Sequence, residues 1–104
     1  MGFALAAVLA EVRAGEMKPC VVERRRVLLL RQGDTVVAFE DRCAHLGIPM
    51  STGRWEGDVL TCCVHGWTYN AKTGQGLIPQ SARLHRFAVK VEDGKIWVDV
   101  EQSG

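Results

Sequence analysis

The 104-residue sequence lacks a strong excess of charge of either sign, since 13 basic and 12 acidic side chains leave a formal net charge of +1. This balance gives no electrostatic reason to expect a nucleic acid or an anionic membrane as a partner. Long hydrophobic runs are lacking as well, because the apolar residues 3–10 are too few to span a bilayer and follow no basic segment. We therefore expect neither a membrane span nor a signal peptide, and we expect a cytoplasmic protein.

Internal repeats, low-complexity tracts and linker-like runs of proline, glycine and serine are also lacking, so we expect one domain over residues 1–104. Apolar and polar residues alternate along most of the chain, a pattern typical of β-strands. Two alternating runs flank Asp93 and Gly94, a dipeptide that favours a tight hairpin turn. A second hairpin is expected around Gly33. The pattern predicts a small antiparallel β-sandwich or barrel.

Two segments are harder to interpret. Residues 3–12 are rich in alanine and leucine, which favours a helix. Pairing with another strand can override this propensity, and we predict a strand over residues 3–9. The basic run at residues 24–26 is interpreted as a solvated turn between strands and not as a binding patch.

Two short motifs each place one cysteine close to one histidine: Cys43 with His45, and Cys62 with His65. Residues 46–61 separate the two motifs. A Rieske-type [2Fe–2S] centre requires two cysteine ligands on one iron and two histidine ligands on the other. Two loops that each offer one cysteine and one histidine can bind such a cluster, each giving one ligand to each iron. A structural zinc ion takes the same atoms and stays open as an alternative, although zinc fingers usually pair like ligands within an arm.

The other two cysteines, Cys20 and Cys63, are left out of this ligand set. Four cysteines would suffice for two disulfides, but without a secretion signal the cysteines beside histidines are better interpreted as metal ligands. We expect Cys20 to behave as a buried small hydrophobe and Cys63 as a loop residue that binds no metal. Gly47 and Gly66 follow the histidines and would allow the tight backbone that such loops need.

Residues 43–47 and 62–67 resemble the two ligand boxes of the Rieske family. Further similar segments cover nearly the whole chain: residues 15–17, 37–41, 53–57, 73–74 and 91–98. The resemblance implies an all-β Rieske-type fold with a cluster-binding subdomain of two loops at about residues 41–80. It also implies one [2Fe–2S] cluster per chain, held by these ligands: Cys43 and Cys62 on one iron, His45 and His65 on the other, more exposed iron.

The resemblance also bears on the reduction potential. High-potential members carry an additional cysteine in each box, and these two cysteines join in a disulfide; Ile48 and Val64 stand at those positions here. Those members also place a serine after the second histidine and glycine, where this chain has Trp67. Both differences imply a potential toward the lower end of the Rieske range of roughly −150 to +300 mV. Tyr69 matches a tyrosine of the high-potential group and points the other way.

By this resemblance the protein is a soluble Rieske ferredoxin and not an enzyme. Such ferredoxins carry single electrons, in transient contacts, from a flavin-dependent reductase to a terminal oxygenase. Residues 67–79 resemble the ferredoxin of toluene-4-monooxygenase-type diiron systems, which we favour over a ring-hydroxylating dioxygenase system. Two further alternatives are a zinc-stabilised structural or interaction module and a regulatory subunit bound permanently to an enzyme.

Other residues are given roles by the same reasoning. Around the expected cluster end we predict an apolar docking rim of Leu46, Ile48, Pro49, Trp67 and Pro79. Charge complementarity with partners is assigned to Asp41, Arg42 and Arg54. Trp55 and Trp97 are expected to pack in the core or in hairpins, and His85 is expected on the surface of a strand.

Overall fold

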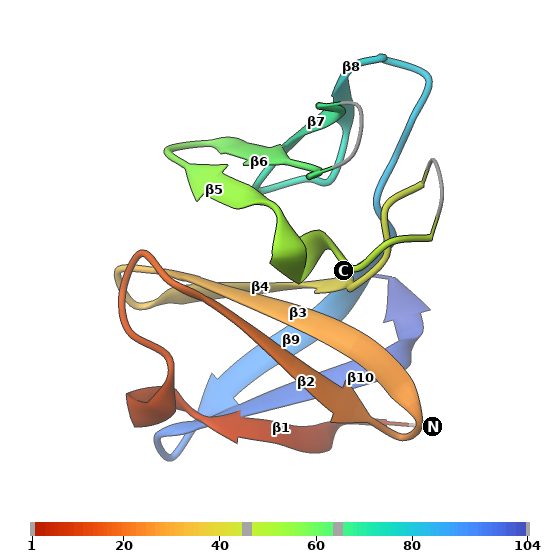
Figure 1. Ribbon diagram of the computed structural model, residues 1–104. Helices are drawn as coiled ribbons and strands as arrows, with labels where there is room; N and C mark the ends of the chain where they lie inside the picture. The colour runs from red at the N-terminus through yellow and green to blue at the C-terminus, as the bar shows by residue number, and fades with distance from the viewer. Residues whose placement is uncertain (1, 45–46, 64–65, 104) are drawn as a thin grey trace.

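A computed structural model of the chain describes residues 2–44, 47–63 and 66–103. It contains two antiparallel sheets, a larger one below and a smaller one above in Figure 1. In this described part, the helical segments are two short 3-10 helices at Leu9–Glu11 and Met50–Thr52. The prediction of an all-β antiparallel fold is confirmed. None of the helices described is long and apolar enough to cross a membrane.

The larger sheet has six strands in the order β1-β10-β9-β4-β3-β2 and curls until β1 contacts β2, which gives a nearly closed barrel (Figure 1). Its strands are β1 Ala4–Val8, β2 Met17–Val22, β3 Arg25–Gln32, β4 Thr35–Glu40, β9 Arg86–Glu92 and β10 Lys95–Ser103.

The smaller sheet is an excursion of the chain between two paired strands of the barrel. The chain leaves the barrel after β4, builds the small sheet and returns at β9, which pairs with β4 through Ala38 and Phe87. Four strands follow one another in space as in sequence: β5 Arg54–Glu56, β6 Val59–Thr61, β7 Thr68–Asn70 and β8 Gly76–Ile78. Both ligand motifs lie within this excursion, so the barrel fixes its two ends.

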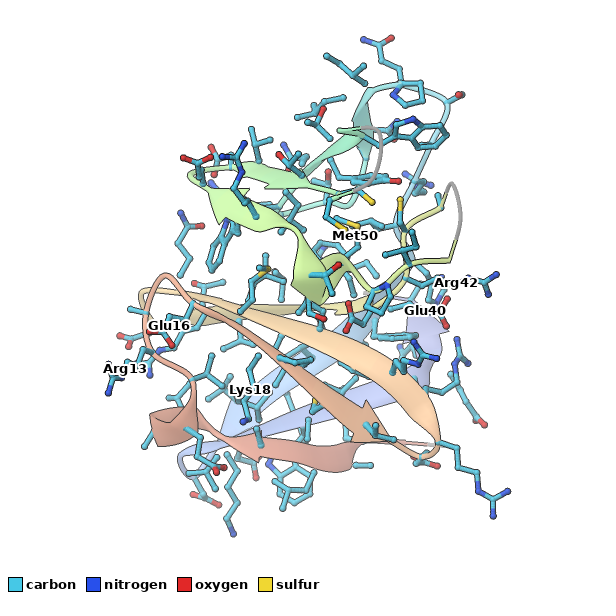
Figure 2. All side chains as sticks on the ribbon, in the orientation of Figure 1. Arg13, Glu16, Lys18, Glu40, Arg42 and Met50 are labelled. Carbon is cyan, nitrogen blue, oxygen red and sulfur yellow. The ribbon has the colours of Figure 1, made fainter. Side chains whose placement is uncertain are left out.

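Strand β3 joins the two parts because it is buried on both faces. Successive side chains of a strand point to opposite faces. Val27 and Leu29 therefore pack into the barrel core, while Leu28 and Leu30 pack into a second core beneath the small sheet. Met50 lies in this second core, between the two sheets in Figure 2. The barrel wall thus forms the floor on which the excursion packs.

The N-terminal strand is confirmed, since residues Ala4–Val8 form β1. It pairs antiparallel with β10, with Ala4 opposite Val98 and Leu5 opposite Trp97. Alanine and leucine favour a helix in isolation, but these pairings satisfy the backbone and bury Ala7 in the barrel core. The helical tendency survives only in the short turn at Leu9–Glu11.

The predicted hairpins at Gly33 and at Asp93–Gly94 are confirmed. Asp93 and Gly94 both have positive φ (55° and 70°), as a type I′ turn requires. The interpretation of the arginine run was wrong in part: the turn consists of Glu23 and Arg24, while the next two arginines begin β3. They belong to the strand because the ladder of β2 and β3 continues up to the turn.

Candidate metal centre

Two loops of the same design carry the predicted cysteine ligands. The Cys43 N–H donates to the carbonyl of Ile48 over 2.7 Å, and the Cys62 N–H donates to the carbonyl of Trp67 over 2.8 Å. In both loops the cysteine is therefore tied to the residue five positions later. The predicted histidine ligands, His45 and His65, stand between these bonded residues in the sequence and lie outside the described residues.

Glycines allow these loops to close tightly. Gly47 and Gly66 have φ values of 70° and 65°, in the left-handed region that favours glycine. Gly53 serves a different purpose, because a Cβ there would overlap the carbonyl oxygen of Thr61 and crowd the Cα of Cys62. The absence of a side chain at Gly53 lets the end of the first loop region pass directly against the second ligand loop.

Both predicted cysteine ligands lie in the second core. Cys43 and Cys62 are both buried and belong to the same apolar cluster, which also contains Met50, Leu60 and Tyr69. A thiolate buried in apolar surroundings is costly unless a positive charge balances it. Two buried thiols that converge from two loops therefore fit the cysteine half of a [2Fe–2S] site, because an iron between them would supply that charge.

Tyr69 on β7 lies in the second core and contacts the first loop. Its hydroxyl lies 3.4 Å from the Cys43 Sγ and accepts a hydrogen bond from the Ala44 N–H over 3.3 Å. Since the oxygen accepts from Ala44, its own proton is available to the cysteine sulfur. Burial, followed by the hydrogen bond with Cys43, raises the pKa of Tyr69 well above its usual range, so the phenol stays protonated.

A buried carboxylate braces the first loop. Asp41 follows β4 and accepts two hydrogen bonds from Ser51, one from the backbone N–H and one from the hydroxyl, each 2.8 Å long. These bonds hold together the two ends of the segment that contains Cys43. Sequence reasoning assigned Asp41 to partner electrostatics and did not find this role, which depends on a contact across ten residues.

Cys63, which is not among the predicted ligands, links the two loops. Its thiol lies 3.1 Å from the hydroxyl of Thr52, which itself donates to the Pro49 carbonyl. Because the Thr52 proton is engaged with Pro49, the Cys63 thiol is the donor in this pair. Cys63 is exposed, whereas Cys20 is half-buried on β2 and packs against the barrel core, close to the expected small hydrophobe.

The remaining predicted residues divide between packing and surface. Trp67 is half-buried against the second core, and Trp55 donates its Nε1–H to Gly57 within the β5–β6 hairpin. His85 is exposed and precedes β9, where its ring packs edge-on against Phe87. Of the predicted apolar rim, Leu46 lies outside the described residues; the half-buried members are Ile48, Pro49, Trp67 and Pro79.

The model of the Rieske [2Fe-2S] domain family matches residues 3–93. The chain is 34% identical over 96 residues to ferredoxin CarAc of Metapseudomonas resinovorans, a match that covers 86% of this chain and 90% of that protein. It is 32% identical over 88 residues to the ferredoxin component of the alkene monooxygenase system of Xanthobacter autotrophicus, covering 84% and 72%.

Two further similarities differ in how much of the similar protein this chain covers. It is 30% identical over 105 residues to methylxanthine N1-demethylase NdmA of Pseudomonas putida, but it spans only 30% of that protein's length. A chain in the solved complex of reduced oxygenase and oxidized ferredoxin in carbazole 1,9a-dioxygenase matches with a TM-score of 0.85 at 28% identity, covering 98% of this chain and 95% of that one. The chain belongs to the Rieske [2Fe-2S] family, and this membership implies a [2Fe-2S] cluster as its cofactor.

Replacing Tyr69 by phenylalanine should lower the midpoint potential of the cluster-loaded protein by tens of millivolts. The hydroxyl's hydrogen bond stabilises the reduced form more than the oxidised form, because the cysteine sulfur carries more negative charge after reduction. A hydrogen bond to a charged group is worth about 1.5–3 kcal/mol in total, so its removal should make reduction less favourable. A spectroelectrochemical titration measures the shift. Trp55→Phe is the control, because it changes another aromatic residue packed against the second core and removes a hydrogen bond within the β5–β6 hairpin. An unchanged potential in the Tyr69 variant would show that the hydroxyl does not tune the site.

Proposed function

We propose that this chain is the ferredoxin of an oxygenase system, with a cluster bound by Cys43 and Cys62 on one iron and by His45 and His65 on the other. When bound, such a cluster accepts and releases one electron at a time. The observation that carries the proposal is the pair of buried thiols, which belong to one apolar cluster and come from loops closed in the same way. Two relatives that the chain covers over most of their length are ferredoxin components.

Different residues of the chain would support different requirements of an electron carrier. The second core keeps water from the two cysteines, and Tyr69 holds a proton at the Cys43 sulfur. The Asp41–Ser51 bonds and the loop closures fix the backbone around the ligands, so little has to reorganise when charge arrives. We treat residues 1–104 as one domain whose cluster subdomain spans about residues 41–80, consistent with the excursion between β4 and β9.

The partners we propose are a terminal oxygenase and a flavin-dependent reductase, each bound transiently. The similar chain in the carbazole 1,9a-dioxygenase complex supports docking to an oxygenase. The resemblance of residues 67–79 leads us to favour a diiron monooxygenase over a dioxygenase, and the alkene monooxygenase relative supports that choice as much as CarAc supports the other. The reductase is proposed from the family resemblance alone, and a location in the cytoplasm is proposed as the sequence analysis expects.

Electron delivery is tested by replacement of a known carrier. The alkene monooxygenase system of Xanthobacter autotrophicus and the carbazole 1,9a-dioxygenase system are each reconstituted without their own ferredoxin, and the cluster-loaded chain is added. We expect it to restore turnover, more strongly in the monooxygenase system. If the chain takes up one electron from dithionite but passes it to neither oxygenase, the proposed function is wrong.

The ligand assignment predicts that cluster binding is lost when a ligand is replaced and kept when another cysteine or histidine is replaced. Cys62→Ser and His65→Ala should abolish the visible absorption of the cluster, because each removes an iron ligand. The matched controls, Cys63→Ser and His85→Ala, change the adjacent cysteine and the third histidine and should retain the absorption. Circular dichroism reports whether each variant keeps its β-structure. Loss of the cluster in a control, or its retention in both ligand variants, would overturn the assignment.

The residues around the second loop predict a low potential. Trp67 has no hydroxyl to replace the serine that high-potential members of the family place at its position, so we expect the reduced form to be stabilised less than in those members. A redox titration of the wild-type protein should give a midpoint below about 0 mV, in the lower part of the Rieske range. A midpoint well above that value would show that Tyr69 dominates the tuning.

A further inference from the structure

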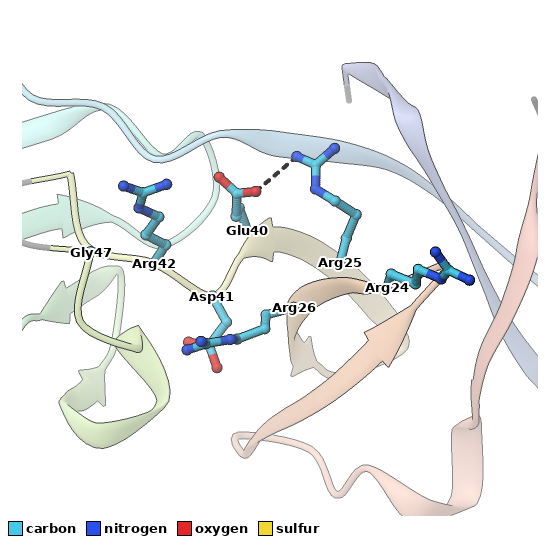
Figure 3. A pocket seen from close by; sticks show the side chains of 7 residues that line it. All are labelled: Arg24, Arg25, Arg26, Glu40, Asp41, Arg42 and Gly47. Carbon is cyan, nitrogen blue, oxygen red and sulfur yellow. Dashed lines mark hydrogen bonds and ion pairs between the residues drawn. The ribbon is translucent and has the colours of Figure 1, made fainter.

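A pocket rich in arginine lies beside the first ligand loop, in a place that the ligand assignment does not use. Its volume is about 400 Å³ (Figure 3). The residues that line it come from the β2–β3 turn, the start of β3, the end of β4 and the first loop: Arg24, Arg25, Arg26, Glu40, Asp41, Arg42 and Gly47. Four arginines, three of them consecutive in sequence, therefore line one pocket together with two acidic residues.

The two carboxylates are already engaged. Glu40 forms an ion pair with Arg25, with 2.8 Å between the Arg25 Nη2 and the Glu40 Oε2, drawn as the dashed line in Figure 3. Asp41 is buried and accepts both of its hydrogen bonds from Ser51. Within residues 2–44, 47–63 and 66–103, no ion pair to Arg24, Arg26 or Arg42 is present, and all three are exposed. The pocket therefore presents a local excess of positive charge on a chain whose net charge is only +1.

The pocket borders the expected cluster site. Arg42 directly precedes the ligand Cys43, and its guanidinium lies against the loop, since a Cβ added at Gly47 would be 3.0 Å from the Arg42 Nε. A group bound to these arginines would therefore lie against the first ligand loop. In Figure 3 the Arg42 and Arg25 side chains lie on either side of Glu40.

The turn that presents Arg24 is unusual. Glu23 and Arg24 occupy the two central positions of a two-residue hairpin turn with φ values of 49° and 68°. Turns of this kind strongly prefer Asn-Gly or Asp-Gly, and left-handed backbone is unfavourable for other residues. The chain thus accepts local strain at an arginine that lines the pocket, and strained backbone is often found at functional positions.

We propose that this arginine pocket receives a carboxylate-rich surface segment of a redox partner and orients that partner against the first ligand loop. The proposal rests on the proposed function, since a carrier must dock briefly to a protein that gives or takes the electron. Complementary charge favours such contacts because it accelerates and orients the encounter while leaving the complex easy to dissociate. Guanidinium groups suit carboxylates because they offer paired N–H donors in a planar fork.

The test compares two triple variants with the same loss of charge. The first is Arg24→Gln with Arg26→Gln and Arg42→Gln. The control is Arg13→Gln with Arg83→Gln and Lys95→Gln, three exposed residues outside the pocket, of which Arg13 lies at the far end of the barrel from Arg42 in Figure 2. Both variants must show the visible absorption of the loaded cluster, so that folding and cofactor content are matched.

Direct binding is measured with a fluorescently labelled hexaglutamate peptide as the probe, and with inorganic phosphate as the competitor. We expect the pocket variant to bind the peptide at least tenfold more weakly than the wild type, and the control to change little. Equal weakening in both variants would show a general charge effect and would overturn the proposal. Displacement of the peptide by phosphate at low concentration would overturn it as well, because it would indicate a site for a small anion.

Electron transfer supplies the functional readout, in whichever reconstituted oxygenase system the chain supports. At about 0.01 M ionic strength, where charges act over about 30 Å, we expect the pocket variant to react roughly tenfold more slowly than the control with the reductase or the oxygenase. At about 1 M, where this range falls to about 3 Å, the rates should converge. Identical rates for both variants at every salt concentration would overturn the proposal while leaving the carrier function intact. If no electron is transferred at any salt concentration, the carrier function itself fails.

Discussion

The fold depends on burying two thiols together in one apolar core, although they come from loops that residues 46–61 separate. Two negative sulfurs in such surroundings are costly unless a metal balances them. The two ligand loops place their cysteines in this core by the same local structure. Each cysteine N–H bonds to a carbonyl five positions later, and a left-handed glycine lies inside each closed loop. The loops bring the thiols together, and Tyr69 places a hydrogen-bond donor at one of them.

The barrel matters to this site as a platform. Strand β3 packs one face into the barrel core and the other into the core that holds the thiols, so the two cores share a wall. The excursion starts and ends on the neighbouring strands β4 and β9, and Asp41 is bonded to Ser51 directly above this joint. The same joint carries the arginine pocket, because the end of β4 and the start of β3 lie side by side. A rigid support thus holds both the electron-carrying site and the surface proposed to orient its partner.

Local signals predicted much of this arrangement. Asp93–Gly94 predicts its hairpin because few residues tolerate two positive φ values in succession. The cysteine and histidine spacing indicates the metal centre because few sites call for that ligand mixture. What the sequence did not indicate depends on contacts between distant segments. Residues 4–8 are a strand because β10 pairs with them, and Asp41 is a brace because Ser51 returns to it. The arginine run seemed an ordinary solvated turn for the same reason, since Arg42 joins it only in the folded chain.

The function proposed for this chain requires a two-iron cluster with cysteine and histidine ligands. It is tested most directly on the purified protein by metal and sulfide analysis, combined with electron paramagnetic resonance before and after reduction. We expect a red-brown protein with two irons and two acid-labile sulfides per chain, and a rhombic signal that arises only on one-electron reduction. A colourless protein with one zinc ion per chain and no signal on reduction would contradict it.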